Sequence, residues 1–587
     1  MLNDAQARAV EVYGHCLITA CPGSGKTTVL VHRAAHLLSK PGVTVMGVTF
    51  SSESAKELER RVKAKVPDAS RRALFGTFHG LCKRQLEAGG HKFKLVNENQ
   101  QSDLMRRAYV DTITTEDQVD FETSVAFVDK MKSAVDPILP SPHVEPRVKV
   151  YERYEELLRQ TGAYDFADLL RLAVRGMRTA PGMKGHVSPY KSTYMLVDEW
   201  QDTDEVQYDW VKEHITHGTS VTVVGDDDQS IYSWRGANGA KAMNDFKYLT
   251  QATHVALDTT YRYPKEIMAP AAQLILNNED RIPKALRTAN LSKGVVEVVR
   301  CASDDDEAAK VWTAVLESGE PGAWAILART NMQLERLEQK KPDGVACQRI
   351  GGTSFWELQA PALYLSLVRS LVANEMHSLD IVLKASGMGE ESLSRLHQEC
   401  RSGQPGAVIR FIEQKKQGSI ASPEERLRER MKQWRSMLGG GDVNLVLKGM
   451  AHYLKTYASV GAKGRTGDSA ANDHRRFDAS AAILCRLKGP LHLRLRAISQ
   501  DEAAREGAVK LMTMHASKGL EFKHIWVMGC EDGKIPSQKG LMDEERRLFY
   551  VALTRARQRL TVSYVVGEDS RPSPFLFESG LFVLAAR

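Results

Sequence analysis

The segment ACPGSGKT, at residues 20–27, has the residue types and spacing that bind phosphate. It follows the apolar run CLITA and precedes TVLVHRAAHLL, so a strand, a glycine-rich turn and a helix start come in P-loop order. Gly23 and Gly25 let backbone N–H groups close round an anion, while Lys26 is expected to reach the β- and γ-phosphates and Thr27 to ligate Mg²⁺. The alternative is a glycine-rich turn that carries a surface lysine.

Two adjacent carboxylates, Asp198 and Glu199, follow the apolar run YMLV. Asp198 is expected to hold Mg²⁺ and Glu199 to orient and deprotonate an attacking water. A solvated acidic turn after a strand is the alternative. Beside a P-loop, the paired carboxylates favour hydrolysis of the bound nucleotide over its storage.

Short apolar runs typical of buried parallel strands must position these groups. The first set lies near Val43, Thr193, Ser220 and His254, and the second begins at Val295, Trp324, Lys510, His524 and Leu560. Helix-like segments separate the runs in both sets. The pattern predicts two doubly wound α/β units.

Two mainly helical segments interrupt the α/β pattern. We expect a first α/β domain at residues 1–84 and 191–260 with a helical insertion at 85–190. A second is expected at 261–360 and 501–587 with a helical insertion at 361–500. Between Arg401 and Ser480 there are 15 basic and 8 acidic side chains, which predicts a basic face on the second insertion.

The composition, 42% hydrophobic and 26% charged over 587 residues, is that of a globular protein. There is no apolar run of membrane-spanning length and no signal-peptide pattern at MLNDAQARAV, so we expect a cytoplasmic protein that binds no membrane. The eight cysteines form no CxxC pair, which argues against zinc and iron-sulfur sites.

The segment VVGDDDQSIYSWRGA, from Val223, closely resembles motif III of the UvrD/Rep/PcrA branch of helicase superfamily 1. Further segments resemble the family's other motifs in the family's order: LNDAQ, VTFSSESAKEL, GTFH, DFADLL, TYRYP, MHASKGLEF and ERRLFYVALTRAR. The resemblance covers nearly the whole chain. It implies an α/β fold of two RecA-like P-loop domains, each interrupted by a mainly helical insertion, with ATP between them.

The resemblance also implies roles at the ATP site. Gln6 would contact the adenine edge, Tyr261 would stack on the ring, and Glu521 would lie near the ribose. Gln229 would sense the γ-phosphate, and Arg262 and Arg555 would reach it from the second α/β unit; a surface ion pair is the alternative for either arginine. The loop that would bind the nucleotide comprises Ala20, Cys21, Pro22, Gly23, Ser24, Gly25, Lys26, Thr27 and Thr28.

For single-stranded DNA, the resemblance implies contacts from aromatic, hydroxyl, imidazole and guanidinium groups that stack on bases or hold phosphate. These are Phe50, Thr77, His79, Tyr232, Trp234, Arg235 and His515. Burial in a hydrophobic core is the alternative for the aromatic residues.

Four positions depart from the family pattern. Ala20 replaces the first P-loop glycine, Thr260 replaces an asparagine, and Trp200 replaces a tyrosine. Thr28 stands where many relatives carry an arginine against adenine, which puts one adenine contact in doubt. The second insertion also shows little of the family's pattern.

The expected function is that of an ATP-dependent 3′→5′ DNA helicase in DNA repair, recombination or replication. It would act on single-stranded DNA and duplex junctions as a monomer or weak dimer, with ATP and Mg²⁺. One alternative is a translocase that strips proteins from single strands without unwinding. A helicase-nuclease motor is disfavoured because few residues follow Arg559, and a non-enzymatic binding module because Glu199 and Gln229 are present.

Overall fold

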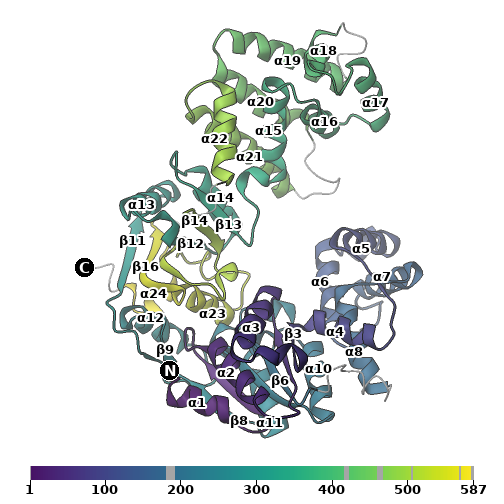
Figure 1. The fold of residues 1–587 in the computed structure, drawn as a ribbon. Helices are drawn as coiled ribbons and strands as arrows, with labels where there is room; N and C mark the ends of the chain where they lie inside the picture. The colour runs from purple at the N-terminus through teal and green to yellow at the C-terminus, as the bar shows by residue number, and fades with distance from the viewer. Residues whose placement is uncertain are drawn as a thin grey trace. The chain divides into compact units, whose positions relative to one another are not determined.

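The computed structural model describes residues 2–179, 192–414, 422–458, 467–503, 507–567 and 570–582. The chain divides into two compact units. Figure 1 labels their helices and strands. The first comprises Met1–Val296, Pro536–Arg559 and Pro574–Arg587, and the second comprises Glu297–Ile535 and Leu560–Ser573. Residues 261–296 and 536–559 therefore group with the P-loop, whereas the sequence places them in a second domain. The division into four domains remains a prediction.

A six-stranded parallel sheet forms the centre of the first unit, in the order β3-β2-β6-β7-β1-β8. Its strands are β1 (Cys16–Ala20), β2 (Val45–Thr49), β3 (Ala73–Thr77), β6 (Tyr194–Val197), β7 (Ser220–Gly225) and β8 (Thr253–Leu257). Five of them coincide with predicted strands. The sixth, β3, is the run ALFGT, which was not predicted.

Alternate residues of the buried strands pack on opposite faces of this sheet, as a strand covered on both sides requires. Leu17, Met195 and Val197 belong to one hydrophobic core, and Ile18 and Leu196 belong to the other. The helices that accompany the sheet are α1 (Asp4–Glu11), α2 (Lys26–Leu38), α3 (Ser52–Lys65), α4 (Phe78–Ala88), α10 (Glu205–Thr216) and α11 (Gly239–Thr250).

Further along the chain, the first unit adds a short strand pair and three helices. These are β9 (Thr259–Thr260), β10 (Arg287–Thr288), α12 (Lys265–Ile275), α23 (Met542–Leu553) and α24 (Pro574–Glu578). Strand β9 follows β8 directly, so the sheet leads straight into the TYRYP motif. Helix α23 packs against α12.

The first helical insertion has a core of its own, which contains Val128, Tyr154 and Leu157. Its helices are α5 (Glu98–Thr112), α6 (Phe121–Lys132), α7 (Arg147–Thr161) and α8 (Phe166–Thr179). The insertion was predicted to lack strands, but β4 (Lys94–Leu95) and β5 (Ala163–Tyr164) form a two-residue parallel pair. Residues 180–191 of the predicted insertion lie outside the described residues.

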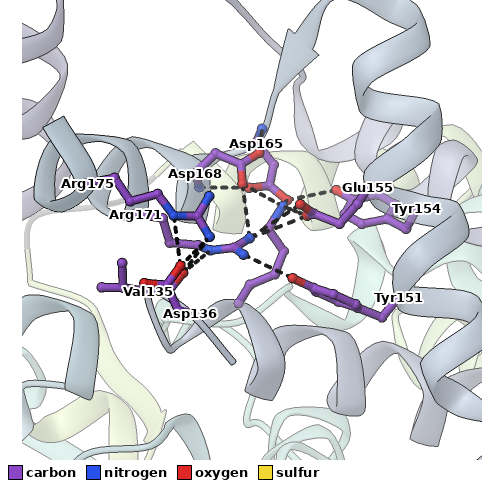
Figure 2. Close-up of polar contacts among 10 residues, drawn as sticks. Val135, Asp136, Tyr151, Tyr154, Glu155, Asp165, Asp168, Arg171 and Arg175 are labelled. Carbon is purple, nitrogen blue, oxygen red and sulfur yellow. Dashed lines mark hydrogen bonds and ion pairs between the residues drawn. The ribbon is translucent and has the colours of Figure 1, made fainter. Parts of the chain in front are cut away.

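A buried polar cluster ties α6, α7 and α8 together (Figure 2). The ammonium of Lys132 lies 2.7 Å from a carboxylate oxygen of Glu155 and 2.8 Å from those of Asp165 and Asp168. Tyr154 donates its hydroxyl to Asp165 at 2.9 Å. Burial raises the pKa of Asp168 even though Lys132 opposes the shift. The two acids of the DFADLL motif therefore hold the helices of this insertion.

Most of another six-stranded sheet lies in the second unit, in the order β11-β16-β15-β12-β14-β13. Its strands are β11 (Val295–Cys301), β12 (Trp324–Ala328), β13 (Cys347–Ile350), β14 (Val509–Thr513), β15 (Phe522–Val527) and β16 (Ala556–Val565), with helices α13 (Asp304–Glu317) and α14 (Asn331–Gln339). Strands β15, β12, β14 and β13 pair in parallel. Two α/β sheets with helical insertions confirm the predicted fold class; β13 was not predicted.

The second helical insertion packs round a hydrophobic core that includes Tyr364, Trp434 and Met450. Its helices are α15 (Gln359–Val372), α16 (Met376–Ala385), α17 (Glu390–Glu399), α18 (Ala407–Glu413), α19 (Pro423–Gly439), α20 (Val443–Tyr457), α21 (Gly467–Arg486) and α22 (Leu491–Ala503). Part of its basic excess is neutralised internally, since Arg428 pairs with Glu424 and Glu425. Among the described residues, no helix combines the length and apolarity that a membrane crossing needs.

Candidate nucleotide and DNA site

The P-loop connects β1 to α2, which begins at Lys26. Gly23 and Gly25 have φ angles of 77° and 85°, which favour glycine. A Cβ on Gly23 would lie 2.5 Å from Cβ of Arg262 and 2.6 Å from the hydroxyl of Thr260. The main chain of Tyr261 donates a hydrogen bond to the carbonyl of Gly23 at 2.9 Å. The TYRYP segment thus lies directly against the loop, which leaves no room for a side chain at Gly23.

Lys26 pairs with one of the two predicted carboxylates at the end of β6. Its ammonium lies 3.2 and 3.1 Å from the two carboxylate oxygens of Glu199. Burial alone would lower the pKa of Lys26, but Glu199, Asp226 and Asp198 outweigh it and raise that pKa. Burial, followed by the charge of Glu199, raises the pKa of Asp198 to about 7. The carboxylates round Lys26 thus concentrate negative charge in a largely buried place.

Gln229 and the two predicted arginines form the next part of the site. Arg555 is 1% exposed and donates to Gln229 Oε1 at 2.8 Å and to the carbonyl of Val551 at 2.8 Å. Arg262 donates to the carbonyl of Thr554 at 3.2 Å. Burial, together with the charge of Arg262, lowers the pKa of Arg555 to about 9. Both arginines belong to the compact unit that contains the P-loop. That they reach the γ-phosphate from the second α/β domain remains a prediction.

An acidic cluster follows β7. Within the part of the chain that the structure describes, Asp226, Asp227 and Asp228 are close enough to share a cation. The ammonium of Lys284 lies 2.5, 2.6 and 2.9 Å from oxygens of these three carboxylates, and Arg281 adds two bonds to Asp228. Lys284 and Arg281 therefore already offset most of the negative charge of this cluster. Asp226 in turn accepts from Gln229 Nε2 at 2.5 Å.

The residues predicted to contact adenine gather at the start of α1. Gln6 donates to the carbonyl of Ser24 at 2.9 Å and accepts from the main chain of Asn3 at 3.0 Å. Asn3 donates to the hydroxyl of Tyr261 at 2.7 Å. Both ends of the Gln6 amide are thus bonded within the protein, whereas Tyr261 is 47% exposed.

The four departures from the family pattern each have a place in the fold. Arg61 of α3 donates to the hydroxyl of Thr28 at 3.1 Å, so a guanidinium lies beside Thr28 although the chain carries none at that position. Trp200 is fully buried and donates to the carbonyl of Ala242 at 3.1 Å. Thr260 is buried under Gly23, and Ala20 ends the buried strand β1.

Five of the seven predicted DNA contacts line one cavity of about 250 Å³: Phe50, Thr77, His79, Tyr232 and Arg235. The rings of Phe50 and Tyr232 are nearly parallel, with an angle of 7° and 6.0 Å between centroids. The guanidinium of Arg235 lies 4.5 Å from the ring of Trp234, which is 65% exposed. Burial lowers the pKa of His79, which keeps its imidazole neutral at pH 7. Parallel rings beside a cavity suit the stacking of bases.

The remaining two predicted residues belong to the second unit. His515 begins the short helix His515–Ser517, and Glu521 lies on the exposed turn before β15.

The family comparisons agree with this geometry. Residues 2–248 match the UvrD/REP helicase N-terminal domain, and residues 490–567 match the UvrD-like helicase C-terminal domain. DNA helicase II of Salmonella typhimurium is 31% identical over 98% of this chain and 87% of its own length. The chain belongs to the UvrD/Rep helicase family. DNA helicase II of Escherichia coli is likewise 31% identical over the same shares, and ATP-dependent DNA helicase PcrA of Leuconostoc citreum is 28% identical over 98% of this chain and 84% of its own length.

The site of this UvrD/Rep-type chain contains residues that sequence reasoning did not select. Gln201 and Asp226 contact the predicted catalytic residues, and Lys284 contacts Asp226. Asp226 lies inside the segment VVGDDDQSIYSWRGA, and Gln201 follows Glu199 by two positions, so both lie in or beside segments that the sequence indicated. Lys284 lies in a segment without a recognisable motif.

Proposed function

We propose that this chain is an ATP-dependent DNA helicase that translocates 3′→5′ on single-stranded DNA and unwinds duplexes in DNA repair, recombination or replication. The observation that carries the proposal is the connected set Lys26–Glu199 and Gln229–Arg555 beside the P-loop. The names of the relatives, DNA helicase II and ATP-dependent DNA helicase PcrA, support the same activity.

The residues present fit a nucleoside triphosphate. In the P-loop, Ser24 Oγ is buried and has no hydrogen-bond partner, as expected of a group that awaits a ligand. Burial and the charge of Arg262 lower the pKa of Arg555. A bound anion would stabilise both guanidinium charges. Both features support binding of phosphate in this cradle.

The residues also fit Mg²⁺. Thr27 and Asp198 would supply the hard oxygen ligands that this ion prefers. The pKa of about 7 at Asp198 reflects crowded, desolvated negative charge that a cation would relieve. Bound there, the ion would neutralise charge on the phosphates.

Hydrolysis then follows from the positions of the side chains. Incoming phosphate competes with Glu199 for the ammonium of Lys26, which frees the Glu199 carboxylate to accept a proton from the attacking water. Gln229 and the guanidinium groups of Arg262 and Arg555 would contact the γ-phosphate and stabilise the charge that develops during transfer.

DNA binding is proposed for the Phe50–Tyr232 cavity and its neighbours. Stacking on aromatic rings is tolerant of sequence, so we expect binding to any single strand, with an affinity that falls as salt rises. The acidic residue Asp202 follows Glu199 by three positions and lines the same cavity, so nucleotide and DNA sites share one short segment.

The test is steady-state ATP hydrolysis with and without single-stranded DNA, for the wild type beside Lys26→Ala and Glu199→Gln. Duplexes with a 3′ or a 5′ single-stranded tail are added in parallel reactions. We expect stimulation by DNA that both substitutions abolish, and separation of the 3′-tailed duplex only. Stimulation with both duplexes intact would indicate a translocase that displaces proteins, and no stimulation would refute the motor function.

A further inference from the structure

Gln201 lies where the hydrolytic motifs meet. It belongs to the short helix Trp200–Asp202 and is fully buried. Its Nε2 donates to Oε2 of Glu199 at 2.6 Å and to Oδ2 of Asp202 at 3.2 Å, and its Oε1 accepts from the main-chain N–H of Asp226 at 2.9 Å. One amide therefore joins the proposed general base to the strand that leads to Gln229.

These bonds fix the orientation of the amide. A carboxylate only accepts and a main-chain N–H only donates, so a flipped Gln201 amide would face a like partner on both sides. The amide also needs a glycine at position 225, since a Cβ there would lie 2.6 Å from Gln201 Oε1. The hydrogen bonds therefore define one orientation of the amide.

The connection continues to the arginine side of the site. Asp226 accepts from Gln229 Nε2, and Gln229 Oε1 accepts from Arg555. Lys284 holds the other oxygen of Asp226 at 2.5 Å. Displacement of Asp226 would therefore move Gln229 as well as the Gln201 amide.

We propose that Gln201 is a positioning residue for hydrolysis, which holds Glu199 at the angle needed for proton abstraction and keeps it in register with Gln229. This inference rests on the proposed function. Lys26 also contacts Glu199, but that ammonium is required by the phosphates once nucleotide binds. The bond from Gln201 does not compete with phosphate, so it remains to orient Glu199 during the chemical step.

The experiment measures single-turnover ATP hydrolysis with saturating single-stranded DNA, together with the KM for ATP and the affinity for DNA. Gln201→Met removes all three side-chain hydrogen bonds at similar size, and Gln201→Glu keeps the acceptor for Asp226 but turns a carboxylate toward Glu199 and Asp202. Misplacement of a catalytic group by a fraction of an ångström slows reactions steeply, so both variants should lose about 10- to 100-fold in rate. KM and DNA affinity should stay within about twofold, because Gln201 is fully buried and is not among the residues that line the DNA cavity.

Gln85→Met is the matched control. Gln85 is a buried glutamine that also bridges two groups, the indole of Trp210 and the carbonyl of Ala173, in the same unit. Its loss should lower thermal stability about as much as Gln201→Met while the hydrolysis rate stays unchanged. An equal loss of rate in Gln85→Met would show that general loosening explains the effect, and would overturn the proposal.

A double-mutant cycle with Glu199→Gln tests whether Gln201 acts by positioning Glu199 or contributes to hydrolysis independently of Glu199. If Gln201 acts through Glu199, adding Gln201→Met to Glu199→Gln should change the residual rate by less than about twofold. Full additivity, or a normal rate in Gln201→Met or in Gln201→Glu, would overturn the proposal while the helicase function stands. Absence of DNA-stimulated hydrolysis in the wild type would instead refute the proposed function itself.

Discussion

Replacement of Arg555 by methionine should abolish ATP hydrolysis and, at the same time, stabilise the nucleotide-free protein. The guanidinium is buried next to that of Arg262, and its pKa is lowered to about 9. The charged form is therefore held at a cost that a neutral side chain of similar length would not incur. In the proposed function, this charge serves the γ-phosphate, which is absent until ATP binds.

The magnitude follows from that pKa. Each pKa unit corresponds to about 1.4 kcal/mol. The lowering of the Arg555 pKa from 12.5 to about 9 therefore means that the folded protein destabilises the charged guanidinium by about 5 kcal/mol. The hydrogen bonds from Arg555 to Gln229, Val551 and Thr554 are lost in the variant, at about 1–4 kcal/mol in total. The free energy of unfolding should therefore rise by about 1–4 kcal/mol, and the hydrolysis rate should fall by about 10³-fold or more.

Urea unfolding followed by tryptophan fluorescence, without nucleotide, measures the first quantity, and DNA-stimulated hydrolysis measures the second. Arg546→Met is the control, because Arg546 is also buried but pairs with Asp543 and Glu578. Pairing raises the pKa of Arg546, so its loss should lower stability. An Arg555→Met protein that is less stable than the wild type would refute the electrostatic argument.

Three further predictions follow from the described contacts. Gly23→Ala should raise the KM for ATP by about 10-fold or more, since its Cβ would clash with Arg262 and its φ is positive; a KM within about twofold of the wild type would contradict this. Burial lowers the pKa of His214 to about 3. As the pH falls below about 6.5, the unfolded chain is protonated at His214 while the folded protein is not, so the free energy of unfolding decreases. From pH 7 to pH 5 this loss is about 2 kcal/mol in urea unfolding, and His214→Gln should remove it; an unchanged pH dependence in the variant would show that another group titrates. Phe50→Ala should weaken single-stranded DNA binding by about 1–3 kcal/mol in anisotropy titrations. Unchanged affinity would argue against the stacking of a DNA base on the Phe50–Tyr232 ring pair.

The sequence predicted the parts of the fold that depend on local pattern. Apolar runs of strand length, bounded by turns, located β1, β2, β6, β7 and β8, and the P-loop was placed by its own glycine spacing. Strand β3 was missed because ALFGT lacks β-branched residues apart from its last. Its place in the sheet comes from pairing with β2, which is a long-range contact.

The site shows the same division. Lys26, Asp198 and Glu199 were recognised because each motif implies its own chemistry. Lys284 could not be, since nothing in its own segment indicates that it lies against three aspartates 56–58 positions earlier in the chain. The grouping of Arg555 with the P-loop unit likewise depends on tertiary packing that no local spacing encodes.

The bond between the main chain of Tyr261 and Gly23 has a consequence for genetics. Because its donor and acceptor are both backbone groups, every residue other than proline at position 261 can form it. An alanine scan of the TYRYP segment would register the ring and the guanidinium and would leave this link undetected. Substitution of side chains does not remove this main-chain bond. The contact between the P-loop and the TYRYP segment can therefore persist while the residues around it diverge.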